Sequence, residues 1–88
     1  MRKEHYYLLA FNSTHFAISA ETYLSKTIHV TIMPTLRKIT ASCGISIRIE
    51  PENYTKAIEL INCNPKIKKN SMPYEISDEN VIPLSYEN

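Results

Sequence analysis

Glycine is almost absent from this chain: one of its 88 residues is glycine, and none is tryptophan. A single glycine excludes the glycine-rich loops that cradle nucleotide phosphates. Two cysteines are too few for the disulfide framework that stabilises many small secreted domains. No stretch approaches the roughly 18 consecutive apolar residues that a membrane span requires. These scarcities argue against a nucleotide-loop enzyme, a disulfide scaffold and a membrane-spanning protein.

An excess of charge of one sign is also lacking. Ten Lys and Arg residues face nine Asp and Glu residues, which gives a formal net charge of +1. Dedicated nucleic-acid binders carry a clear basic excess, so we expect no nucleic-acid partner. Residues 1–5 are mostly polar and precede any signal-like apolar run. We therefore expect no membrane partner and a cytoplasmic location, where both thiols stay reduced.

The spacing of apolar residues predicts one small α+β domain. The apolar run over residues 6–11 is typical of a strand with both faces covered, and helical spacing follows over residues 14–26. Period-two alternation predicts strands over residues 28–33 and 45–49. Pro51 then opens a second helix, because proline suits the first helical turn.

The pattern weakens after Pro65. Residues 66–69 are expected to start a charged edge strand, and residues 74–76 belong either to that strand or to another. Residues 77–88 are expected to form a polar C-terminal tail that is disordered or packs on this domain or on a partner. Strand, helix, strand, strand, helix, strand is the order of the ferredoxin-like βαββαβ sandwich. We therefore predict an antiparallel sheet with two helices on one face, as a single domain over residues 1–76.

This topology is expected to bring chemically active residues to one edge of the sheet around Cys43. A cysteine near the first turn of a helix meets unpaired N–H groups, which favour the nucleophilic thiolate, as do nearby cations. Gly44 would let the backbone approach a ligand closely or adopt a dihedral closed to other residues. The candidate binding residues around this thiol are Ser13, Thr14, His15, Arg37, Ser42 and Gly44.

These residues also have plainer structural interpretations. A lone cysteine is most often a small, inert, buried side chain, and this holds for Cys63 even more than for Cys43. Ser13 and Thr14 most simply cap a helix, and His15 is most simply a solvent-facing polar residue. The two cysteines form neither a C-x-x-C redox motif nor a zinc knuckle, so no metal and no cofactor are predicted.

Two motifs resemble a known family. The first is YLLAFNSTH over residues 7–15, with Ala17, Ala20 and Glu21 after it. The second is Ser42-Cys43-Gly44, which follows a proline-containing loop and precedes a strand with Arg48. In this order they resemble the selenium/sulfur carrier-like family, from about Tyr6 to Ile61. The resemblance implies that Cys43 holds a chalcogen as a persulfide or selenosulfide, with sulfur or selenium donor and acceptor proteins as partners.

Three functions stay open at this point. A carrier would exchange a sulfur or selenium atom on Cys43 without turnover of its own, and Arg37 or Lys38 would steer an acidic partner. A non-catalytic regulatory module would bind a ligand or protein, possess a structural Cys43 and pair into a homodimer through its sheet. A reductase would use Cys63 as resolving thiol, which requires Cα atoms within about 7 Å.

Overall fold

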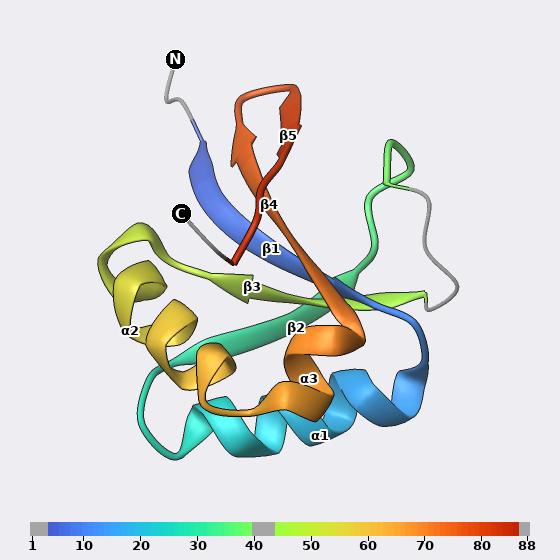
Figure 1. Ribbon diagram of the computed structural model, residues 1–88. Helices are drawn as coiled ribbons and strands as arrows, with labels where there is room; N and C mark the ends of the chain where they lie inside the picture. Colours follow the sequence, from blue (N-terminus) through green and yellow to red (C-terminus); the bar gives the residue numbers. More distant parts are fainter. Residues whose placement is uncertain (1–3, 40–43, 87–88) are drawn as a thin grey trace.

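The computed structural model describes residues 4–39 and 44–86. Within these residues the elements are β1 (His5–Phe11), α1 (Thr14–Ser25), β2 (Val30–Pro34), β3 (Ile45–Ile49), α2 (Pro51–Asn62), α3 (Pro65–Lys69), β4 (Ser71–Ser77) and β5 (Asn80–Pro83). The strands form one antiparallel sheet in the order β2-β3-β1-β4-β5, and the helices lie on one side of it (Figure 1). The α+β class is therefore confirmed, and α3 and β5 are additions to the predicted elements.

Apolar side chains pack on both faces of this sheet. On the helix side, Leu9 and Phe11 of β1 belong to a core that the three helices cover. On the opposite side, Leu8 and Ala10 belong to a second apolar cluster. β1 supplies both clusters because successive strand residues point to opposite faces. The predicted coverage of both faces of this strand is confirmed.

The segment that follows β2 covers part of the second face. It turns away from the helices (Figure 1), and it brings Ile39 and Leu36 against Tyr6 and Ile76. Ile39 is buried by this packing. The loop therefore serves as a cover for the sheet rather than as a free connection at its edge.

The prediction of an edge strand over residues 66–69 is wrong, because these residues form the helix α3. Asn64 Oδ1 accepts a hydrogen bond from the Ile67 N–H at 3.3 Å, and Pro65 occupies the first turn. Both are start signals of a helix. Ile67 is buried in the helix-side core, so this short helix is held by one apolar side chain and one cap.

Residues 77–86, the described part of the expected polar tail, contribute to the sheet and the core. β5 pairs with β4, with Glu75 opposite Ile82, after a turn in which Asp78 has a φ of 57°. Aspartate is one of the few residues that tolerate this left-handed conformation. Tyr86 is only 8 % exposed and belongs to the helix-side core. The four residues of β5 show only weak alternation of apolar and polar side chains. They pair with β4 because an edge strand presents unpaired N–H and C=O groups.

Candidate functional site

The predicted thiol site directly precedes Gly44 and β3 in the sequence. Ser42 and Cys43 lie outside the described residues. Gly44, the next residue, is exposed, and its carbonyl oxygen accepts a hydrogen bond from the Thr35 N–H at 3.0 Å. This bond continues the pairing of β2 with β3 by one residue. The backbone that directly follows Cys43 in the sequence is thus tied to the end of β2.

A pair of hydroxyl groups reinforces this tie. Thr35 Oγ1 and Ser46 Oγ lie 2.6 Å apart, and Ser46 is fully buried. A buried hydroxyl group requires a hydrogen-bond partner, and Thr35 supplies it. Sequence analysis missed both residues, although Ser46 stands as a lone polar residue between Ile45 and Ile47 of the strand pattern.

Two alternatives were predicted for Gly44: a close approach of the backbone to a ligand, or a dihedral that is closed to other residues. Its φ is not positive, so it does not adopt a dihedral that is closed to other residues, and that expectation is wrong. A Cβ atom added to Gly44 would meet no atom within 4 Å. The open space leaves room for another molecule to approach this end of the sheet.

The start of α1 carries the next three predicted site residues. Ser13 is the N-cap, with an extended φ of −153°, and its Oγ accepts from the Phe16 N–H at 3.4 Å. Its capping role is confirmed. Thr14 and His15 are exposed, and the His15 ring meets the Phe16 ring edge-on at 5.4 Å between centroids.

The start of β4 lies at the same end of the sheet. The Asn12 N–H and side-chain amide donate to the backbone and side-chain oxygens of Asn70, each at 3.0 Å. Across the sheet, Ala10 lies opposite both Ser46 of β3 and Met72 of β4. Neighbouring strands are about 4.8 Å apart. The Gly44 segment and the end of α3 therefore flank the end of β1 from its two sides.

Arg37 and Lys38 lie on the sheet face opposite the helices, away from the start of α1. Lys38 Nζ donates to the Glu79 carbonyl oxygen at 2.6 Å, in the turn between β4 and β5. The two cations border a cavity of about 330 Å³ whose lining includes Tyr6 and Ile76. The expected meeting of these cations with Ser13, Thr14 and His15 does not occur, because Leu36 and Ile39 hold the loop on the second apolar cluster.

Cys63 is exposed at the C-cap of α2. Its N–H donates to the Leu60 carbonyl at 3.1 Å and to the Glu59 carbonyl at 3.3 Å. Cys63 is therefore not a buried packing residue as expected: its backbone closes the helix, and the residue is exposed. Its use as a resolving thiol stays a prediction.

Comparison with known proteins identifies the family. The family model described as "Putative Se/S carrier protein-like" matches residues 6–76. The chain belongs to this family. The Se/S carrier-like match starts with β1, runs through Cys43 and Gly44, and extends beyond the motif resemblance to the end region of β4. No curated protein and no solved structure matches the chain.

Arg48, part of the family-like motif, lies away from Gly44, near the other end of β3. Its Nε donates to Glu50 Oε2 at 2.7 Å, and its guanidinium carbon lies 4.0 Å from the centre of the Tyr6 ring. The hydrogen bond with Glu50 raises the pKa of Arg48, and burial raises the pKa of Tyr6. These contacts give Arg48 a structural role in joining β3 to the second apolar cluster.

Over residues 4–39 and 44–86, no three His, Cys, Asp or Glu side chains gather as a metal site would require. Among the described helices, none is long and apolar enough to cross a bilayer.

Proposed function

We propose that this chain is a carrier protein that holds a sulfur or selenium atom on Cys43, on a ferredoxin-like βαββαβ framework extended by α3 and β5. The family match carries the proposal, because it spans the Ser42-Cys43-Gly44 motif. The geometry at Gly44 supports it: the backbone after the thiol is tied to Thr35, and the space in front of Gly44 is open.

The proposed chemistry is thiol exchange. The Cys43 thiolate attacks the outer sulfur of a persulfide on a donor such as a cysteine desulfurase. The donor's S–S bond breaks, the donor leaves as a thiolate, and Cys43 becomes the persulfide. An acceptor thiolate then attacks the same outer sulfur and releases the Cys43 thiolate. No external oxidant or reductant enters either step. Transfer of a selenium atom proceeds by the same two exchanges, with a selenosulfide on Cys43 in place of the persulfide.

The proposed carrier acts through protein partners in a sulfur relay and turns over no substrate of its own. A thiol that both accepts and releases an atom must be reached by two different proteins in turn. An exposed residue beside the thiol, with no side chain to obstruct the approach, suits this requirement, and Gly44 is such a residue. The location in the cytoplasm and the formation of a homodimer stay predictions.

The test is to load the purified chain with a cysteine desulfurase and free cysteine, and to locate the added sulfur by peptide mass spectrometry. We expect the mass of one sulfur atom on the Cys43 peptide. Cys43→Ser abolishes this gain, and Cys63→Ser, the matched control at the exposed second thiol, does not. Equal loading of both cysteines, or loading of Cys63 alone, would overturn the proposal.

A binding module is the second candidate, and the cavity beside Arg37 and Lys38 favours it. Tyr6 and Ile76 give this cavity of about 330 Å³ an apolar floor, and its charged rim includes Glu79. Slow alkylation of the thiols across pH 5 to 9 separates the two candidates. A Cys43 that reacts with an apparent pKa below the ordinary value of about 8.5 supports the carrier. An inert or normally titrating Cys43 in a folded chain supports the module.

A further inference from the structure

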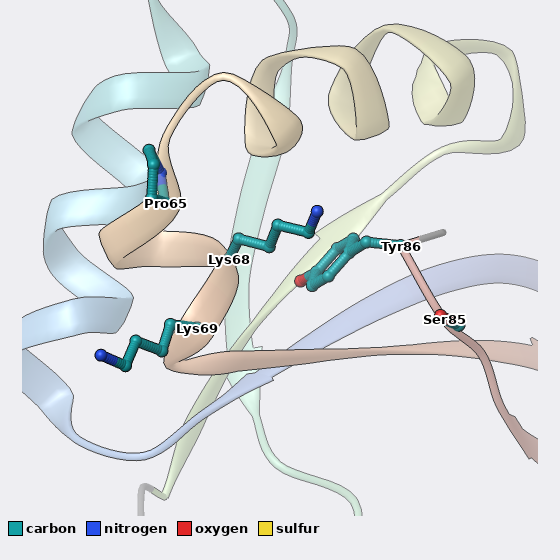
Figure 2. A pocket seen from close by; sticks show the side chains of 5 residues that line it. All are labelled: Pro65, Lys68, Lys69, Ser85 and Tyr86. Atoms are coloured by element: carbon teal, nitrogen blue, oxygen red, sulfur yellow. The ribbon is translucent and has the colours of Figure 1, made fainter. Parts of the chain in front are cut away.

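α3 directs three lysines outward beside the end of the sheet that carries Gly44. Ile67 is 4 % exposed and anchors the helix to the core. Successive helix residues are rotated by about 100°, so the burial of Ile67 turns Lys66, Lys68 and Lys69 away from the core. Lys68 extends toward Tyr86, and Lys69 points to the other side of the helix (Figure 2).

Within residues 4–39 and 44–86, Lys66 and Lys69 have no carboxylate within ion-pair distance. The ion pairs between described residues involve His5, Arg48 and Lys56, and none of them includes Lys66 or Lys69. Both side chains are exposed. The surface of α3 is therefore positive although the whole chain is nearly neutral.

Acidic residues gather at the opposite end of the sheet. β1 begins at the end where β3 and β4 finish. There the Glu4 N–H donates to Asp78 Oδ1 at 3.2 Å, Glu50 follows β3, Glu52 lies in the first turn of α2, and Glu79 follows β4. Arg48 lies within ion-pair distance of Glu4 and Glu50 there, and Lys38 Nζ donates to the Glu79 carbonyl oxygen. That end is therefore of mixed charge, whereas the charged residues of α3 are lysines alone.

A cavity of about 340 Å³ adjoins the basic helix (Figure 2). It is lined by Pro65, Lys68, Lys69, Ser85 and Tyr86. Pro65 and the ring of Tyr86 provide apolar surface, and the lysines provide ammonium groups beside it. The cavity therefore matches an acidic side chain that stands next to an apolar one.

We propose that α3 and this cavity form a docking surface for an acidic peptide segment of a protein partner. The inference rests on the proposed carrier function, since the partner would be the donor or acceptor that must reach Cys43. The Asn12–Asn70 hydrogen bonds hold the end of α3 at the end of the sheet where Gly44 lies. A segment docked on α3 brings its protein to that end. Complementary charge both speeds this encounter and orients it.

A protein fits this surface better than a nucleic acid. The phosphate backbone presents negative charge along its whole length, and its affinity comes from many Lys and Arg contacts. The three lysines of one five-residue helix are few for such a polymer, and the net charge is only +1. A short acidic segment needs only a few such contacts.

The test is an NMR titration of the ¹⁵N-labelled full chain with a synthetic peptide of alternating glutamate and leucine. We expect amide shifts at α3 and Tyr86 that diminish with added salt. The double variant Lys66→Gln, Lys69→Gln should weaken binding about 2- to 30-fold, because each exposed charge pair contributes about 0.2–1 kcal/mol. Lys26→Gln, the matched control at the far end of α1, should leave the affinity unchanged.

Three results would overturn the docking surface: shifts centred on Arg37 and Lys38, equal binding of a glutamine–leucine peptide, or equally tight binding of an oligothymidylate to α3. Cys43→Ser should bind the acidic peptide like the wild type, which keeps the two proposals separable. Peptide binding without sulfur loading of Cys43 refutes the carrier alone. Sulfur loading at a rate that the lysine variants leave unchanged refutes the docking surface alone.

Discussion

Replacement of Tyr86 by alanine should destabilise the whole domain. The ring is 8 % exposed in the helix-side core, and truncation of a buried aromatic residue costs about 3–5 kcal/mol. For 88 residues, at about 0.05–0.15 kcal/mol each, the free energy of unfolding is about 4–13 kcal/mol. Tyr86→Ala should therefore remove a large fraction of the total stability.

Replacement by phenylalanine separates packing from hydrogen bonding. Ser71 Oγ donates its proton to the Ile67 carbonyl at 2.6 Å, so in its 2.6 Å contact with Ser71 the Tyr86 hydroxyl is the donor. Tyr86→Phe keeps the ring and loses this bond, which should cost about 0.5–1.5 kcal/mol. The alanine variant should be the less stable of the two by about 1.5–4.5 kcal/mol.

The same residue makes the stability depend on pH in the alkaline range. Burial raises the pKa of Tyr86 above the ordinary value of about 10. The unfolded chain therefore releases this proton at lower pH than the folded chain. The stabilisation is fully present below about pH 10 and is lost as the pH rises through the folded pKa. Tyr86→Phe should weaken the alkaline decline in the free energy of unfolding.

Urea denaturation followed by circular dichroism, at neutral pH and above pH 10, measures the cost of Tyr86→Ala, the cost of Tyr86→Phe and the alkaline decline in the free energy of unfolding. The two variants and the wild type should unfold in one transition with similar m-values. A change of less than about 0.5 kcal/mol in Tyr86→Ala would refute the reasoning, because that is the range of an ordinary surface substitution. The C-terminal segment would then not be part of the core.

Four further variants test the rest of the description by urea denaturation. Ser13→Ala removes the N-cap of α1 and should cost about 1 kcal/mol, while the neighbouring His15→Ala should stay within about 0.5 kcal/mol. Gly44→Ala should leave the stability within about 0.5 kcal/mol, since its Cβ meets open space, and a large loss would contradict that geometry. Arg48→Lys should cost about 1 kcal/mol through its lost stacking on the Tyr6 ring and its weaker bond with Glu50, and an unchanged midpoint would refute this.

The elements with strong local signals were predictable from the sequence. The alternation over Ile45–Ile49 predicts β3, and Ser13 and Pro51 mark where α1 and α2 begin. α3 and β5 were not predictable from periodicity, because each is too short to show a period. The cap and proline at Asn64 and Pro65 are the signals for α3, and they outweigh the lysines that suggested a charged strand.

The position of the loop after β2 was predictable only in part. The apolar run of β1 requires cover on both faces of the sheet, but two helices on one face supply only one cover. Leu36 and Ile39, three residues apart in a largely polar stretch, are the missing second cover. The packing of Leu36 and Ile39 determines the position of Arg37 and Lys38, which lie between them in the sequence. The residues around these two cations give no sequence signal of that packing.

The position of Arg37 and Lys38 on the face opposite the helices changes which charges can guide a partner toward Gly44. The Lys38 ammonium is bound to the Glu79 carbonyl, and Arg37 borders the same cavity on the face away from the helices. The positive surface near Gly44 therefore comes from α3 instead. Asn70, which follows α3, is hydrogen-bonded to Asn12 at the end of β1. Because β1 and β3 are antiparallel, with Ala10 opposite Ser46, the start of β3 lies beside this end of β1. A partner steered by charge should accordingly approach from α3 and the end of the sheet that carries Gly44, so the proposed docking of an acidic segment and the proposed exchange at Cys43 would occur in one encounter.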